Sequence, residues 1–376
     1  MPTFRHRTQS FVGPTGSRTV ISTGVVDEVT YGDKVFACDD VVGNYPNSNG
    51  LSIDKYWAGD GHISGRSPVF PVYDWAEYPY TNQPSAGPID GWDAGMPDAT
   101  TSVTKVAAKT NPGRANLSVP VFIAELKDLP HMIRGQGDNI LRKKSAARRR
   151  PNQSSVPTEQ FGWSSLFRDL GSLLDFTAYV DKRVVELKSL YSSGGLKVGA
   201  KVWANSLEFE ESSIPFNTVE ASVYGTRTRT CIARRWASVR WRPTFPPPSV
   251  PTDAELLQKA RFAVHGWRIN PADAWELIPW SWLIDYFSNV GDVLNTTGNA
   301  WEYTCDNGCV MTSLVCVSSD RVDSTSEGFI AIPGKSRREL KFRVLANPGL
   351  SVFAPLLSAK QLTNLAAIAV NYGGLK

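Results

Sequence analysis

The sequence predicts an α+β protein, an elongated molecule in which a helical bundle and a twisted antiparallel β-sheet region are each assembled from separate stretches of chain. Some stretches are rich in Gly, Pro, Ser and Thr with short apolar runs typical of strands, and others carry apolar residues at helical spacing. The two kinds alternate as β, α, β, α, β, α, which favours two interleaved regions over two sequential domains. The β-region is expected to comprise residues 1–118, 196–250 and 301–346, and the α-region residues 119–195, 251–300 and 347–376.

The first two blocks differ in periodicity. Residues 1 to about 118 are expected to form short strands and long loops, because they show no helical spacing. Helical spacing begins near Val121, and Pro130 should kink or end that helix. A longer helix is expected from about Ser164 to Tyr191, where a Gly-Gly pair stops it.

The next blocks repeat this alternation. Strands are expected from about 196 to 245, after which three consecutive prolines break the chain. Thr252 and Glu255 form a capping box, in which each side chain satisfies a free backbone amide at the start of a helix. A further helix should begin at Asn270–Pro271, because Asn caps helices well and Pro suits their first turn.

The strongest helical pattern covers about Trp280 to Leu294. Its polar stripe, formed by Asp285, Asn289 and Asp292, is expected to cap neighbouring backbone. Strands return from about 301 to 346, where Asn307–Gly308 predicts a hairpin turn. A final helix is expected to open at Ser358.

Composition and cysteine usage exclude some classes of protein. The 376 residues carry a net charge of only +4, but the basic residues are clustered. The chain has no apolar leader and no run of roughly 18 apolar residues, so neither secretion nor a membrane span is expected. Synthesis in a reducing cytosol with mostly free thiols is expected. A disulfide between Cys305 and Cys309 is not expected, and their spacing with Cys316 does not fit a zinc site. We expect no cofactor and no metal.

Several motifs of the helical half resemble one known family. The segment Ile278–Leu294 resembles the signature helix of the maturation proteins of single-stranded RNA bacteriophages, the levivirus family. Asn270–Glu276, Glu125–Pro130 and Gly162–Leu170 resemble segments of the same family. The sheet half resembles the family only in its layout and in its basic, Trp-rich strands.

This resemblance implies a virion protein with two partners and no enzymatic activity. Such a protein is made in the host cytoplasm and occupies one position in the capsid shell as a monomer, in contact with the coat protein. Its helical region points inward and binds the genomic single-stranded RNA near the 3′ end. Its sheet region points outward and attaches to a bacterial pilus, and the protein then enters the cell with the RNA.

Two basic segments are candidates for RNA contact, because phosphates require cationic partners. The denser one is expected to be a loop between two helices, and a solvated loop without a partner is the alternative. Its candidates are Arg134, Arg142, Lys143, Lys144, Arg148, Arg149 and Arg150.

The second segment is expected to be a strand with arginines on both faces. Its candidates are Arg227, Arg229 and Arg235 on one face and Arg234, Arg240 and Arg242 on the other. We expect this strand at a sheet edge touching RNA or capsid, and an edge strand protected from aggregation by charge is the alternative. A third basic group, between Lys335 and Arg343, is expected to face solvent, and contact with RNA or coat protein is the alternative.

Aromatic residues between positions 56 and 92 are the candidates for pilus contact. Tyr and Trp are frequent interface anchors, although they can equally fill a small sheet core. The candidates are Tyr56, Trp57, Tyr73, Trp75, Tyr78, Tyr80 and Trp92.

Two other functions are kept as alternatives. The first is an RNA-binding structural protein without an attachment role, and the second is a lytic or nucleolytic enzyme. The four histidines lie in no recognisable catalytic motif, and no phosphate-loop or nucleophile-elbow motif is present. Copy number per particle separates a maturation protein from a coat protein, and turnover of a substrate would identify an enzyme.

Overall fold

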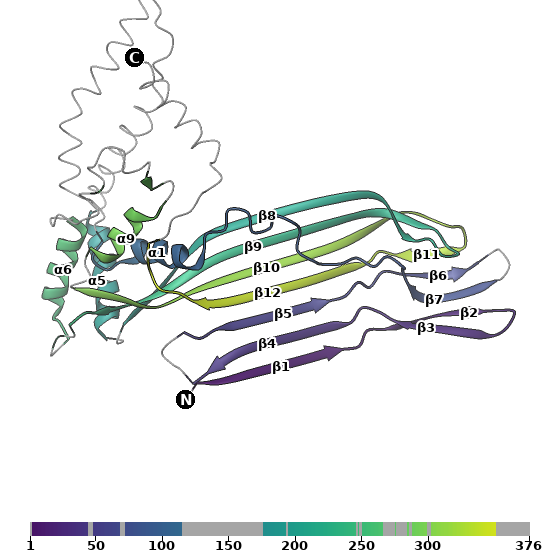
Figure 1. The fold of residues 1–376 in the computed structure, drawn as a ribbon, viewed down its shortest axis with the longest axis horizontal. Coiled ribbons are helices and arrows are strands. Elements are labelled where there is room, and N and C mark those ends of the chain that lie inside the picture. Colours follow the sequence, from purple (N-terminus) through teal and green to yellow (C-terminus); the bar gives the residue numbers. More distant parts are fainter. Residues whose placement is uncertain are drawn as a thin grey trace, which may run out of the picture. The chain divides into compact units, whose positions relative to one another are not determined.

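The protein is a mixed α+β molecule dominated by two antiparallel sheets (Figure 1). The computed structural model describes residues 2–43, 48–67, 72–114, 176–192, 195–245, 247, 250–265, 275, 284–285, 288–298 and 302–350. In this part of the chain there are four helices, and about 53% of the residues are in strands. The predicted α+β class is confirmed at this level.

The larger sheet has seven strands, and its order mixes distant parts of the chain (Figure 1). From one edge to the other the strands are β1 (Thr3–Phe11), β4 (Lys34–Val42), β5 (Leu51–Trp57), β12 (Lys335–Leu345), β10 (Tyr303–Thr325), β9 (Val223–Pro243) and β8 (Leu196–Asn217). The prediction that the arginine-rich strand lies at a sheet edge is wrong, because β9 is bonded on both sides and β8 forms the edge.

The smaller sheet has five strands and a compact aromatic core. Its order is β11 (Phe329–Ile332), β6 (His62–Arg66), β7 (Tyr73–Pro79), β2 (Thr15–Val20) and β3 (Val25–Thr30). The buried residues of this core are Ile63, Trp75, Tyr80, Ile214, Phe216, Ala221 and Val223. Phe216 and Tyr80 stack at 5.8 Å between ring centroids, so the ends of β8 and β9 help to close the core of the smaller sheet.

The predicted hairpin at Asn307–Gly308 is wrong. Both residues lie within β10, which runs unbroken from Tyr303 to Thr325. Asn307 adopts a positive φ of 51°, which Asn tolerates better than most residues. The residue pair therefore marks a local irregularity in a long strand, and the strand reverses only after Thr325.

The helix α1 (Ala99–Thr110) was missed, because residues 1–118 were expected to hold only strands and loops. Asp98 caps this helix, since its Oδ1 accepts a hydrogen bond from the Thr101 backbone N–H at 2.6 Å. Val103, Val106 and Ala107 are buried at helical spacing. The signal was present in the sequence as an Asp before a short amphipathic run.

The helices α5 (Phe176–Ser192) and α6 (Asp253–His265) pack against each other. The predicted capping box of α6 is confirmed, because Glu255 Oε2 accepts from the Thr252 N–H at 2.7 Å and Thr252 Oγ1 accepts from the Glu255 N–H at 3.4 Å. Lys188 of α5 pairs with Asp253 of α6 at 3.0 Å. The structure describes the C-terminal part of the helix predicted from 164 to 191, and α5 confirms that part of the prediction.

The strongest predicted helix, 280–294, is not continuous. Ser288 lies in a β-bridge and Asn289 has a non-helical φ of −118°, so α9 (Val290–Thr297) starts as a separate helix. The expected capping by its polar stripe is confirmed for Asp285 and Asn289. Asp285 Oδ1 accepts from the Gly291 N–H at 3.0 Å, and Asn289 Nδ2 donates to the Gly349 carbonyl at 2.9 Å. Each of these bonds satisfies a backbone group that would otherwise lack a partner.

The chain divides into two compact units, each built from three stretches. The first unit comprises residues 1–102, 200–237 and 307–346, and the second residues 103–199, 238–306 and 347–376. The predicted helices near 121–133, at 270–271 and from Ser358 lie outside the described residues. The functional division into an inward and an outward region stays a prediction.

Candidate functional site

Four strands of the larger sheet place alternate side chains on one shared face. Arg5 on β1 pairs with Asp40 on β4, Asp40 with Leu51 on β5, and Leu51 with Arg343 on β12. Because side chains alternate along a strand, this register fixes every residue on that side. We call this side the open basic face. Its eight cations are Arg5, Arg7, Lys34, Lys55, Lys335, Arg337, Lys341 and Arg343, and its two carboxylates are Asp40 and Glu339.

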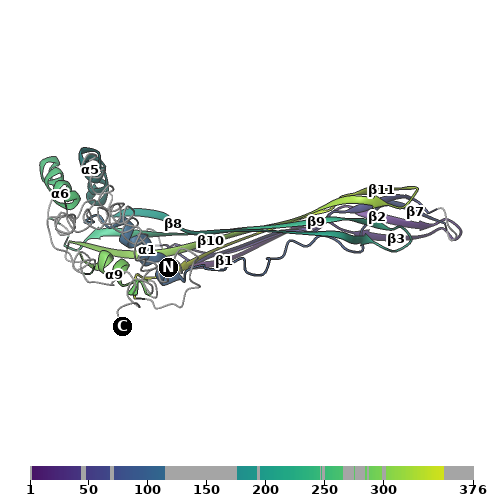
Figure 2. The ribbon, with the colours of Figure 1, turned by 90° about the horizontal axis from the view of Figure 1, so that it is seen from above.

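The opposite face of these strands is covered around Tyr56 and Leu340, on β5 and β12. Tyr56 and Leu340 lie on that side and pack against a buried cluster formed by Ala86, Cys231, Ala233, Leu314 and Cys316. Figure 2 shows the chain between β7 and α1 running along one side of the sheet. Ile89 and Trp92 of this segment also pack on the cluster. Most of the charged side chains of these strands therefore lie on the other side.

The open basic face has more positive charge than it can neutralise internally. Arg5 binds Asp40 through two nitrogens at 3.1 and 2.5 Å, and this pairing lowers the pKa of Asp40. Arg7 shares the same carboxylate at 3.3 Å. Lys341 pairs with Glu339 at 2.5 Å. Among the described residues, no carboxylate forms an ion pair with the remaining cations, which are Lys34, Lys55, Lys335, Arg337 and Arg343. Clustered unpaired cations attract a polyanion.

Aromatic rings are interleaved with these cations. Phe11, Phe36 and Trp57 lie on the open basic face by the same register. The Lys34 Nζ lies 5.1 Å from the Trp57 ring centroid, and the Lys55 Nζ lies 5.4 Å from that of Phe36. Cations for phosphates beside rings for bases are the combination that binds single-stranded nucleic acid without a duplex groove.

The covered face of the same strands is close to electrically neutral. Arg338 lies next to Arg337 in the chain but points to the covered side, where it binds both carboxylate oxygens of Asp54 at 3.1 and 2.7 Å. The pKa of Arg338 is raised by this bond to Asp54. The excess charge is therefore a property of one face and not of the whole sheet.

The arginines predicted on β9 occupy opposite faces, as expected. Arg235 is buried and burial lowers its pKa, whereas its neighbour Arg234 is exposed. Arg227 is occupied internally, because it binds Asp320 at 2.6 Å and donates to Asn82 Oδ1 and the Asn82 carbonyl at 3.0 and 2.8 Å. Arg229 donates to the Gly87 carbonyl at 3.3 Å. These internal bonds explain how an interior strand accommodates arginines on its covered side.

The other predicted RNA residues lie elsewhere. Arg242 pairs with Asp306 at 3.4 Å in the second unit, and Arg240 lies in the same unit. The basic run from Arg134 to Arg150 lies outside the described residues. The RNA role of all these residues stays a prediction. The open basic face as a whole was not predicted from the sequence, although every second residue from Lys335 to Arg343 except Glu339 is basic.

Most aromatics predicted for pilus contact serve the core of the first unit. Trp75 is 2% exposed and Tyr80 is 3% exposed, and the Tyr80 hydroxyl donates to the Ile332 carbonyl at 2.7 Å. Tyr56 and Trp92 are half-buried and pack on the covered face of the larger sheet. Trp75 and Tyr80 were predicted as surface anchors, but both lie in the core. This is the alternative that the sequence left open. Trp57 alone among the seven lies on the open basic face.

Three of these aromatics surround one arginine. The Arg18 guanidinium lies 5.3 to 5.8 Å from the ring centroids of Tyr73, Trp75 and Tyr78. It also pairs with Asp27 at 3.2 Å, and Asp27 accepts a 2.8 Å hydrogen bond from the Tyr78 hydroxyl. This cluster fixes the centre of the smaller sheet by cation–π contact.

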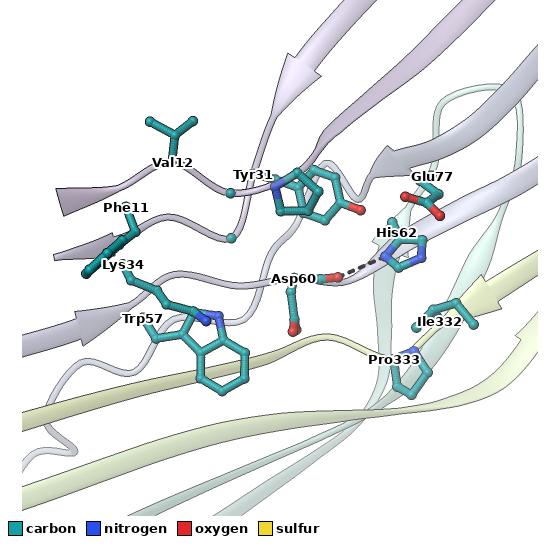
Figure 3. Close-up of a pocket in the computed structure, with 13 residues that line it drawn as sticks. Phe11, Val12, Tyr31, Lys34, Trp57, Asp60, His62, Glu77, Ile332 and Pro333 are labelled. Atoms are coloured by element: carbon teal, nitrogen blue, oxygen red, sulfur yellow. Dashed lines mark hydrogen bonds between the residues drawn. The ribbon is translucent and has the colours of Figure 1, made fainter.

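A cavity of about 410 Å³ lies at one end of the open basic face, within the first unit (Figure 3). Its walls are contributed by loops and strand ends of both sheets. The lining residues are Phe11, Val12, Gly13, Pro14, Tyr31, Gly32, Lys34, Trp57, Asp60, His62, Glu77, Ile332 and Pro333. Glu77 has a positive φ of 50°, and a Cβ on Gly16 would collide with the Glu77 carbonyl. The strained backbone at Glu77 therefore depends on a glycine opposite it.

One disulfide joins neighbouring strands of the larger sheet. Cys231 on β9 is bonded to Cys316 on β10, a pairing that the expectation of mostly free thiols did not anticipate. Cys38, Cys305 and Cys309 are not in disulfides, and burial raises the pKa of the Cys305 thiol to about 12. The side chains that the structure describes include no group of three or more metal ligands.

No protein-family model matches this chain, and no curated protein matches it. None of the described helices is long and apolar enough to cross a membrane.

Proposed function

We propose that the protein is the maturation protein of a single-stranded RNA bacteriophage, which holds the genomic RNA, occupies one position in the capsid shell and adsorbs to the host pilus. The sequence resemblance in the helical half supports this family. The open basic face supports the RNA-binding part, because five of its eight cations have no carboxylate partner among the described residues. That excess of positive charge is the observation that carries the proposal.

The finer architecture belongs to the same proposal. The α5–α6 pair, with α1 and α9, is part of a helical bundle that includes the segments resembling the family. The basic run from Arg134 to Arg150 is the proposed contact for the 3′ region of the RNA. The open basic face adds a second contact for the same polyanion. The protein enters the cell with the RNA and has no catalytic activity.

Attachment is proposed to use the exposed apolar edges of the smaller sheet. The edge strand β3 exposes Val25 at 60% and Val26 at 52%, and the opposite edge strand β11 exposes Ile330 at 70%. Exposed apolar side chains on an edge strand favour contact with another chain, because the strand also offers unpaired backbone groups.

Ultraviolet crosslinking of intact particles tests the RNA-binding part. RNA-linked peptides mapped by mass spectrometry are expected from strands β4, β5 and β12 and from residues 134–150. Quantification in the same particles should give about one copy beside many coat subunits. Particles that retain RNA but give no crosslink in either segment would overturn the RNA-binding proposal. Particles with many copies would instead assign the chain to the shell.

A further inference from the structure

The cavity and the open basic face share a row of side chains. Phe11, Lys34 and Trp57 stand opposite one another on β1, β4 and β5, and all three also line the cavity. Figure 3 shows Trp57, Lys34 and Phe11 along one side and Glu77, His62 and Ile332 along the other. A chain that follows the cations of the face therefore reaches the mouth of the cavity without leaving the aromatic row.

Beyond this row, the charged side chains that line the cavity are carboxylates, which accept hydrogen bonds. Asp60 and Glu77 both line it, and one oxygen of Asp60 accepts the Lys335 N–H at 2.7 Å. Among the residues that the structure describes, the other carboxylate oxygen of Asp60 has no hydrogen-bond partner. Burial and then the charges of Glu77 and Asp60 raise the pKa of Tyr31, so both carboxylates act on the same space. Two carboxylates repel a phosphate but accept hydrogen bonds from N–H groups.

Flat rings form much of the remaining wall. Tyr31 and His62 lie 5.6 Å apart between ring centroids, and Trp57 and Phe11 close the side toward the open basic face. The volume of about 410 Å³ lies within the range of small-molecule sites. Rings, two acceptors and an adjoining cationic track together match one nucleotide whose phosphates remain outside.

We propose that this cavity binds one unpaired nucleobase of a single-stranded RNA, selected for an exocyclic amino group, while the phosphates on either side lie on the open basic face. The inference rests on the proposed RNA-binding function and names the specificity site within it. Guanine, adenine and cytosine offer an amino group to Asp60 and Glu77. Uracil offers two carbonyl oxygens around a single N–H, and the carboxylates repel those oxygens. The surplus of cations beside the cavity opposes a cationic protein as occupant.

The test compares the affinity of the full chain for short uridine oligonucleotides with and without one central guanine, adenine or cytosine. We expect about tenfold tighter binding when an amino-bearing base is present, a difference typical of one well-placed hydrogen-bonded contact. Glu77→Gln and Asp60→Asn should reduce this ratio to about one, because an amide can also donate to uracil. Glu28→Gln removes the same charge from an exposed position on β3 outside the cavity and should leave the ratio unchanged.

The outcomes separate this inference from the proposed function. If Arg337→Gln weakens binding of every oligonucleotide but the wild type shows no base preference, RNA binding stands and the base site is wrong. If the chain binds no RNA, both are wrong. If Glu77→Gln leaves the base ratio unchanged but lowers adsorption to host cells, the cavity serves a protein partner and the inference is overturned.

Discussion

At the residue scale, orientation on a strand decides what each cation does. Arg337 and Arg338 are adjacent, yet one points to the open basic face and the other binds Asp54 on the covered face. A cluster of basic residues in a sequence therefore does not define a surface until the strand register is known. For the group from Lys335 to Arg343, the sequence left solvent, RNA and coat protein open as neighbours and favoured solvent.

Arg337 and Arg338 provide a matched pair of substitutions. Arg337→Gln should lower the affinity for single-stranded RNA several-fold, because it removes one phosphate contact. Arg338→Gln removes the same charge from the covered side and should leave the affinity nearly unchanged. Fluorescence anisotropy with a labelled oligonucleotide measures both. Equal losses in the two variants would show that net charge matters and that the open basic face has no special role.

A second residue, Arg183, is a buried arginine whose role is structural. It is 2% exposed on α5 and donates to the carbonyls of Asn111 and Pro112 at 3.0 and 2.8 Å. It also pairs with Glu186 at 3.3 Å. Burial, together with the nearby charge of Arg114, lowers the pKa of Arg183 to about 10, so the guanidinium still keeps its charge at neutral pH.

Arg183→Met should lower the free energy of unfolding by about 3 kcal/mol, because the carbonyls of Pro112 and Arg114 lose the hydrogen bonds that Arg183 donates. The Asn111 carbonyl and Glu186 keep Arg114 as a partner. Urea unfolding followed by circular dichroism measures this change. Lys182→Met, at the exposed neighbouring position, is the control and should stay within about 0.5 kcal/mol of the wild type. A small effect of Arg183→Met would mean that water replaces the lost donors.

At the element scale, local signals were predictable and sheet partners were not. The capping box at Thr252 and the strands of β8 and β9 follow from the residues themselves. The turn at Asn307–Gly308 failed because β10 continues through it to pair with β12, and long-range pairing outweighed a local preference. The covered position of β9 depends on Asp320 and Asn82, which lie far from Arg227 in the sequence. No pattern within β9 could show these partners.

The disulfide between β9 and β10 gives a prediction for these two elements. It links residues 85 apart, and such a crosslink restricts the unfolded chain by about 4 kcal/mol. Reductant, or the double substitution Cys231→Ala and Cys316→Ala, should therefore lower the melting temperature clearly. Cys309→Ala is the control for loss of a thiol that is not in a disulfide, and it should retain sensitivity to reductant. If the wild-type melting temperature is the same with and without reductant, the crosslink is contradicted.

At the scale of the whole molecule, charge distribution matters more than net charge. The chain carries only +4 overall, although one sheet face alone has eight cations and two carboxylates. The acidic residues must then lie mostly elsewhere. The net charge therefore gave little indication of a polyanion site, whereas the register of four strands locates it.

The dependence of RNA binding on salt measures this charge distribution. Each phosphate neutralised on a single strand contributes about 0.7 to the slope of log affinity against log salt. If roughly five cations engage, the slope should be about −3.5, and Arg337→Gln should reduce it by about 0.7. Titrations at several salt concentrations give both values. A slope near −1 would mean that the open basic face does not follow the RNA backbone.

The pairing of β5 with β12 has a consequence for how the chain is made. Asp54 and Arg338, which bind each other across these strands, are 284 residues apart. At about 5–20 residues per second, a ribosome needs roughly 15 to 60 seconds to deliver the second partner after the first. During that interval β1, β4 and β5 can pair locally, but the free side of β5 has no neighbour. The newly made N-terminal third can therefore misassemble until synthesis is nearly complete. The yield of folded protein should depend on whether the unpaired edge of β5 is shielded from other chains during that interval.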